Sequence, residues 1–326
     1  MPVRTKPAFP DGHGYNPPVT QPAPPFMPLP PFLHAIPRGA RYMLVSALAF
    51  ALMGMCVKFA GQQGIPVLEI IAARALVSLI LSYGDVRRKR IPIFGNHRFL
   101  LFSRGLVGFV SLTGVFYSLV HLPIAEASVL QYLHPMFTAL IALLWLKERP
   151  TLATLVCIAL SFIGLVIMVR PAFLFGGVAA HYDPVAVGIA IAGAFGSGLA
   201  YSIVRRLSAS EDPSVIVFYF PLVTLPLTLL LLGSDFVMPS GWAWLSLLGV
   251  GLFTHAGQVS LTLAMREDTA SRASSFSYAQ VVFAAVIGVV VFGEIPGVWT
   301  LAGASLILCG ALVNILWKGS SKKNRG

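Results

Sequence analysis

The chain has 326 residues, of which 56% are hydrophobic and only 11% are charged, and its mean hydropathy is +0.81. A soluble domain carries about twice that share of charge, so this composition excludes an ordinary water-soluble protein. The formal net charge of +11 does not point to nucleic acid, because clustered bases in a membrane protein mark the loops on one side of the bilayer.

The first 37 residues are rich in proline, as in NPPVTQPAPPFMPLPPF, and lack the continuous apolar core of a signal peptide. This composition predicts a disordered tail over residues 1–37. A bilayer-spanning helix needs about 20 apolar residues, and ten such segments follow the tail. They cover residues 41–60, 66–83, 99–119, 124–146, 151–169, 185–204, 214–232, 242–265, 270–292 and 298–317.

Short connections with turn signals, such as GQQGIP and KERP, separate these segments. An open sheet cannot lie in lipid with its edges unpaired, so the segments predict an all-α integral membrane protein with ten transmembrane helices. The three cysteines, Cys56, Cys157 and Cys309, lie inside apolar segments and show neither metal-site spacing nor a disulfide framework.

Basic residues gather in alternate connections, so ten spans place nearly all of them on one side, with Arg170 as the exception. The loop bases are Arg87, Arg88, Lys89, Arg90, Arg98, Lys147, Arg149, Arg205, Arg206, Arg266 and Arg272. The bases before the first span and in the basic tail 318–326 fall on the same side. Because positive loops stay inside, the pattern predicts a multi-pass protein of the cell (inner or plasma) membrane with both termini cytoplasmic.

The sequence also contains an internal repeat. ASVLQYLHPMFTALIALLWLKERP aligns without a gap over ASSFSYAQVVFAAVIGVVVFGEIP when Glu148 is placed over Glu294. Residues paired in this way are called repeat mates below; Tyr132 and Tyr278 are one such pair. The alignment predicts two repeats of five spans, residues 38–171 and 184–317. Five is odd, so the second copy enters the membrane from the opposite side, and inverted repeats are typical of secondary transporters.

Two longer stretches carry a family resemblance. RGLVGFVSLTGVFYSLVHLPIAEASVLQYLHPMFTALIALLWLKERPT and REDTASRASSFSYAQVVFAAVIGVVVFGEIPGVWTLAGASLILCGALV resemble the two EamA domains of the drug/metabolite transporter superfamily. The shared features are the Arg-Gly at the start of the third span, the pair Phe116-Tyr117, LPIAEA entering the fourth span, and the Glu ending the fourth and ninth spans. The resemblance implies ten helices in inverted repeats and export or uptake of small organic solutes.

Polar residues inside the spans are the candidates for a solute site, because a polar group facing lipid is costly. Gln131 in the fourth span has Ser277 as its repeat mate, and Tyr278 follows on the matching face of the ninth span. Two such stripes predict helices that line one cavity; the alternative is hydrogen bonding between helices. Pro135 predicts a local weakness in the fourth helix that could act as a hinge.

Arg74 lies well inside the second span, so its charge is expected to face a cavity or an acidic partner; the alternative is a packing role. His134, His255 and Gln258 also lie deep in spans, where each is either a site residue or a hydrogen-bonded packing residue. The predicted substrate-binding residues are therefore Arg74, Tyr117, Gln131, His134, His255, Gln258, Ser277 and Tyr278.

No enzyme motif, metal-ligand cluster or phosphate-binding loop occurs, so neither catalysis nor a cofactor is predicted. The sequence predicts a secondary transporter of a small anionic or zwitterionic metabolite, such as an amino-acid derivative, working by alternating access. Two alternatives are a broad exporter of drug-like amphiphiles and a membrane scaffold or sensor that does not transport. Its expected partners are the lipid bilayer and the solute; coupling to protons or ions and oligomeric state stay open.

Overall fold

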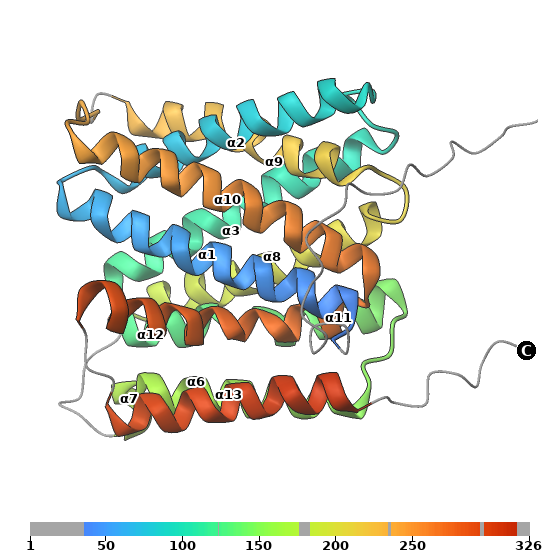
Figure 1. Ribbon diagram of the computed structural model, residues 1–326, viewed down its shortest axis with the longest axis vertical. Helices are drawn as coiled ribbons and strands as arrows, with labels where there is room; N and C mark the ends of the chain where they lie inside the picture. The colour runs from blue at the N-terminus through green and yellow to red at the C-terminus, as the bar shows by residue number, and fades with distance from the viewer. Residues whose placement is uncertain (1–35, 123, 176–182, 234–235, 294–296, 318–326) are drawn as a thin grey trace, which may run out of the picture. The chain divides into compact units, whose positions relative to one another are not determined.

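The computed structural model describes residues 36–122, 124–175, 183–233, 236–293 and 297–317 (Figure 1). Most of the predicted tail 1–37, all of the basic tail 318–326, and Glu294 lie outside the described residues. The described chain is helical. Its elements are α1 (Arg38–Gln62), α2 (Val67–Lys89), α3 (Arg98–His121), α4 (Ile124–Gln131), α5 (His134–Ile141), η2 (Ala142–Leu146), α6 (Leu152–Val169), α7 (Ala172–Phe175), α8 (Pro184–Leu207), α9 (Pro213–Leu232), α10 (Trp242–Glu267), α11 (Ala270–Ser275), η3 (Phe276–Tyr278), α12 (Ala279–Phe292) and α13 (Val298–Leu316).

Within the described residues, ten helical stretches are long and apolar enough to cross a membrane, and each coincides with a predicted span. The all-α, ten-span prediction is therefore confirmed. The fourth crossing combines α4, α5 and η2, and the ninth combines α11, η3 and α12. Several helices are longer than predicted: α2 continues to Lys89, so Arg87 and Arg88 lie on its last turn, where cations stabilise the carboxyl end of a helix.

Short polar side chains fix where several helices begin. Asp183 accepts a hydrogen bond from the backbone N–H of Val185 at 2.9 Å, and Asp212 accepts one from Ser214 at 2.8 Å. In both cases a proline follows the aspartate as the first helical residue, where its missing N–H costs nothing. Thr151 caps α6 in the same way, through the N–H of Thr154 at 3.2 Å.

The two halves of the chain pack mainly against each other, and their contacts occur in symmetric pairs. Helix α1 packs along α10 as its repeat counterpart α8 packs along α3, and α1 contacts α12 as α8 contacts α5. Helices α2 and α9 pair directly, as do α6 and α13, which run side by side in Figure 1. This pattern indicates a pseudo-two-fold axis that exchanges the halves.

Individual contacts follow the same symmetry. A Cβ built on Gly105 would lie 2.7 Å from the side chain of Val223, and one built on Gly251 would meet the side chain of Val77. Gly105 and Gly251 are repeat mates, and so are Val77 and Val223. Between α6 and α13, Gly164 lies against Gly303, and Cys157 lies against Gly310. Moving back seven residues along α6 therefore corresponds to moving forward seven residues along α13. The two counterparts therefore run antiparallel, as the predicted inverted repeat requires.

Replacing Gly164 with alanine is expected to destabilise the protein by about 1–3 kcal/mol, because overpacking forces neighbouring backbone apart. The added Cβ would lie 2.6 Å from the carbonyl oxygen of Gly303, which cannot rotate away as a flexible side chain can. Thermal unfolding of the detergent-purified protein should show a lower Tm. Gly188→Ala is the matched control, because a Cβ there has no neighbour within 4 Å. An unchanged Tm in Gly164→Ala would contradict this close helix contact.

The fourth and ninth crossings are interrupted at equivalent positions. Helix α4 ends at Gln131 and α5 begins at His134, with Pro135 in its first turn, so the predicted weakness at Pro135 is confirmed. In the ninth crossing the 3-10 turn Phe276–Tyr278 occupies the equivalent place, although the repeat mate of Pro135 is Val281. The interruption therefore does not depend on proline alone.

Candidate functional site

A cavity of about 310 Å³ lies between the two halves, and helices from both contribute to its wall. Its volume is at the lower end of the ~300–1,000 Å³ range of small-molecule pockets. The polar side chains on the wall are Arg74, Arg104, Ser111, Gln131, Tyr132, His134, Ser197, Tyr201, Gln258 and Gln280. Among the residues that the structure describes, no aspartate or glutamate lies on the wall. A larger groove of about 730 Å³ between α2 and α10 is lined by apolar residues, including the exposed Trp242, as expected for a lipid-facing surface.

Two arginines form the charged part of the cavity. Arg104 on α3 is only 4% exposed, and its Nη2 donates to Oε1 of Gln258 at 3.0 Å. The guanidinium carbons of Arg104 and Arg74 lie 4.5 Å and 5.6 Å from the ring centre of Phe220. Among the described residues no carboxylate forms an ion pair with either arginine, and Nε of Arg104 is buried without a hydrogen-bond partner. Two positive charges therefore share one ring and lack an anion.

Another part of the wall is formed where the two interrupted crossings meet. The Tyr278 hydroxyl donates to the backbone oxygen of Tyr132, its repeat mate 146 residues away, at 2.9 Å. The rings of the two tyrosines stack with centres 5.8 Å apart. Residues that touch their own repeat mates lie on the pseudo-two-fold axis, so this pair and the pair Arg74–Phe220 mark the axis. Helices broken near the middle of the membrane are the places where transporters build substrate sites.

His134 holds this region together. Its Nδ1 lies 3.2 Å from the carbonyl oxygen of Gln131, and its Nε2 lies 3.2 Å from Oγ of Ser277. The ring meets Tyr201 edge-on, with centres 5.2 Å apart. Both ring nitrogens are thus occupied by protein groups, while the ring itself lines the cavity.

The structure places the eight predicted site residues in three groups. Arg74, Gln131, His134 and Gln258 line the cavity. Ser277 and Tyr278 lie behind the wall and support it through His134 and Tyr132. His255 and Tyr117 do not line it: Nδ1 of His255 is buried without a hydrogen-bond partner, and Tyr117 stacks on His121 at 4.0 Å.

Several wall residues are not among those predicted from the sequence. Arg104 carries the same signal as Arg74, a charge inside an apolar segment, but enters the prediction only as part of the Arg-Gly motif. Gln280 is the repeat mate of His134, and that pairing alone could have found it. Phe220 and Tyr201 carry no sequence signal that separates them from aromatic residues facing lipid.

One end of the bundle, here called the basic end, carries the connections that follow α2, η2, α8 and α10. Glu211 in the connection after α8 accepts the backbone N–H groups of Asn96 and His97, each at 2.7 Å. The most extensive hydrophobic cluster of the described residues fills this end, and its members Met43, Leu207 and Met265 are at most 1% exposed. In contrast, α1 lines the cavity with its second half and α2 with its first half, so the cavity extends toward the opposite end.

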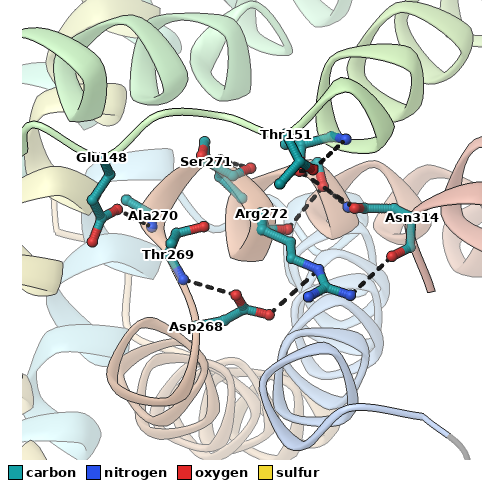
Figure 2. Close-up of polar contacts among 11 residues, drawn as sticks. Glu148, Thr151, Asp268, Thr269, Ala270, Ser271, Arg272 and Asn314 are labelled. Atoms are coloured by element: carbon teal, nitrogen blue, oxygen red, sulfur yellow. Dashed lines mark hydrogen bonds and ion pairs between the residues drawn. The ribbon is translucent and has the colours of Figure 1, made fainter. Parts of the chain in front are cut away.

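A polar network crosses the basic end (Figure 2). Glu148 Oε1 accepts from Arg205 Nε at 2.7 Å, and its Oε2 accepts from the N–H of Ala270, the first residue of α11, at 2.8 Å. Arg205 Nη1 also donates to the carbonyl oxygen of Met265 at 2.8 Å. These contacts, here called the Glu148 bridge, connect the end of the fourth crossing with α8, α10 and α11.

Arg272 continues the network toward α13, because its Nη2 donates to the carbonyl oxygen of Asn314 at 2.9 Å. Its Nε lies 3.6 Å from Oδ2 of Asp268. Burial raises the pKa of Asp268 above its ordinary value, although the charge of Arg272 and the N–H of Thr269 oppose the rise. The Asn314 amide donates to Oγ of Ser275 at 2.8 Å, so α11 and α13 are also joined.

Comparison with known proteins gives one family for both halves. The model of the EamA-like transporter family matches residues 37–170 and 185–316. The pseudopaline exporter of Pseudomonas aeruginosa is 30% identical over 281 residues, covering 86% of this chain and 96% of that protein. The riboflavin transporter of Vibrio cholerae is 27% identical over 296 residues, covering 88% and 95%. A solved crystal structure with 20% identity covers 84% of this chain and 95% of its own, with a TM-score of 0.74, and therefore shares the fold.

Proposed function

Because the chain belongs to the EamA-like transporter family, whose members move small molecules across membranes and are not enzymes, we propose that it is a secondary transporter of small organic anions. The observation that carries this proposal is the pair Arg74 and Arg104 in a cavity whose described wall residues include no carboxylate. A zwitterionic amino acid would bring an ammonium group. The two guanidinium groups would repel it, and no carboxylate among the described wall residues would neutralise it. The cavity therefore favours an anion over a zwitterion.

The position of the cavity supports alternating access. It lies on the axis that exchanges the two halves. When one inverted repeat rocks against the other, a site on this axis is exposed first to one side of the membrane and then to the other. In this arrangement the basic end is closed by a hydrophobic cluster and the Glu148 bridge, while the cavity extends toward the opposite end. We take residues 38–171 and 184–317 as the two units that rock.

Flux measurements in vesicles containing the purified full-length protein test the function. Vesicles preloaded with a mixture of small organic acids should accumulate labelled organic acids from outside by exchange, and mass spectrometry identifies which ones. Amines of matched size are the control, because two arginines repel them. Preferred movement of cationic amphiphiles would instead support a broad drug exporter. If no solute moves under any imposed gradient, the protein is a scaffold or sensor rather than a transporter.

We also propose that the basic end is cytoplasmic, with both termini on that side of the cell membrane, because basic loops remain inside. Arg149 lies three residues before the start of α6, and Gly297 lies directly before α13, the antiparallel counterpart of α6. Cysteines that replace Arg149 and Gly297 are therefore expected to be accessible from opposite faces.

The labelling experiment uses a background in which Cys56, Cys157 and Cys309 are replaced by alanine. A membrane-impermeant maleimide applied to intact cells should label Gly297→Cys at once and Arg149→Cys only after permeabilisation. Labelling of both positions in intact cells would contradict the inverted arrangement, and the reverse pattern would contradict the proposed orientation.

A further inference from the structure

Three pairs of repeat mates at the cavity differ in polarity, whereas His134 and Gln280 are both polar. Arg104 and Gln258 form the hydrogen-bonded pair on the wall. Of their repeat mates, Leu112 lines the cavity, and Val250 borders it with its side chain fully buried (0% exposed). Arg74 has Phe220 as its repeat mate, and both line it too. At each of these three positions one copy contributes a charged or amide side chain and the other contributes an apolar one.

The symmetry gives this difference a spatial meaning. A two-fold axis carries the pair Arg104–Gln258 onto the equivalent position across the axis, which is where Leu112 and Val250 belong. Arg74 and Phe220, which contact each other, lie on the axis between the two positions. The cavity therefore has Arg104 and Gln258 on one side, here called the cationic wall, and Leu112 on the other, here called the apolar wall, with Arg74 and Phe220 between them.

Taking the proposed transport of organic anions as given, we infer that the solute is an amphipathic anion: a single carboxylate or comparable oxyanion attached to a compact apolar body. The oxyanion would be held by Arg104 and Arg74, whose guanidinium donors suit planar oxygen pairs. The apolar body would lie along Phe220 and Leu112. A small hydrophilic acid would leave the apolar wall without a partner, and a neutral aromatic compound would leave both arginines without one.

A binding assay with the purified full-length protein separates these requirements. The probes are 3-phenylpropionate, its amide, propionate, and 3-phenylpropyl phosphate, with binding followed by isothermal titration calorimetry. We expect the acid to bind at least about 10-fold more tightly than the amide, since hydrogen bonds to charged groups contribute about 1.5–3 kcal/mol each and 1.4 kcal/mol is tenfold. It should bind at least about 10-fold more tightly than propionate, because burial of the phenyl group contributes about as much.

The phosphate probe identifies the anionic group. Tighter binding of 3-phenylpropyl phosphate than of 3-phenylpropionate assigns the cationic wall to phosphate esters, and the opposite order assigns it to carboxylates. Both orders uphold an amphipathic anion.

Two variants assign the two walls. Arg104→Gln should abolish the preference for the acid over its amide, and Leu112→Thr, which places a hydroxyl group on the apolar wall, should reduce the preference for the acid over propionate by about 3-fold or more. Arg98→Gln and Val45→Thr are the matched controls, because both residues are exposed on other surfaces. Neither control should alter either preference.

Equal affinity for the acid and its amide, or for the acid and propionate, would overturn the inference. If small hydrophilic acids then still accumulated in vesicles, the proposed function would stand and only the amphipathic solute would be wrong. If vesicles moved no organic anion at all, the proposed function itself would fail.

Discussion

Arg104→Gln is expected to reduce the transport efficiency for organic anions by about 100-fold, because loss of one partner from a buried charge pair costs about 2–5 kcal/mol. The same substitution should leave the Tm unchanged or raise it. Arg104 is 4% exposed, its guanidinium donates to the neutral amide oxygen of Gln258, and it lies close to a second cation, Arg74. Removing that charge removes the desolvation cost of a buried cation without a counter-ion, a cost that a bound anion would otherwise offset.

The opposite signs of the two effects make the prediction specific. If Arg104 served mainly to pack against Phe220, its loss would lower the Tm and reduce transport only through a smaller amount of folded protein. Flux per folded molecule in vesicles and thermal unfolding in detergent therefore need to be measured on the same preparation. Arg98→Gln is the control, because this exposed arginine contacts Phe94 away from the cavity. A lower Tm with unchanged flux per molecule would remove Arg104 from the binding site.

The fold could be predicted from the sequence because lipid imposes a simple rule. A helix of about 20 apolar residues is what the bilayer requires, and the bases in alternate loops fix the number of crossings. The repeat was visible because Glu148 and Tyr132 recur as Glu294 and Tyr278 when the two copies are aligned without a gap. The broken ninth crossing was not predicted, because its position carries Val281 where the fourth crossing carries Pro135.

The site could be predicted only in part because depth in a span does not determine the direction of a side chain. Arg74 and His255 are both deep and polar, yet Arg74 lines the cavity and His255 does not. The face of a helix that meets the cavity is determined by how the helix packs against its neighbours. For α10, which carries His255, one such contact is the close approach of Gly251 to Val77 on α2. Contacts between helices of different halves, such as Arg104 with Gln258, have no local signature at all.

The asymmetry between the two ends of the bundle suggests how access is controlled. At the basic end the Glu148 bridge joins three segments through a carboxylate. The repeat mate of Arg205 is Phe59, which packs on Phe292 with ring centres 5.1 Å apart. At the basic end the contact is therefore an ion pair, whereas the equivalent position at the opposite end of the bundle has a contact between two aromatic rings. Weakening the Glu148 bridge should favour opening of the basic end without altering the cavity residues.

Glu148→Gln is accordingly expected to increase opening of the basic end by about 10-fold or more, because hydrogen bonds to charged groups contribute about 1.5–3 kcal/mol. The readout is the alkylation rate of a cysteine replacing Val204, which is 1% exposed in the cluster at that end, in the cysteine-free background. Small thiol reagents should reach it about 10-fold faster when Glu148 is replaced. Glu267→Gln is the control, because this exposed carboxylate at the end of α10 belongs to none of the ion pairs in the described chain.

A double variant separates the bridge from a general effect of charge. If Glu148 acts through Arg205, then adding Arg205→Gln to Glu148→Gln should accelerate alkylation little further, since coupled residues are not additive. Fully additive rates, or an equal acceleration by Glu267→Gln, would mean that the loss of any acid at this end loosens the bundle. Saturating solute should slow alkylation in every variant if binding draws the two halves together around Arg74 and Arg104. Protection that survives in Arg104→Gln would place the solute elsewhere.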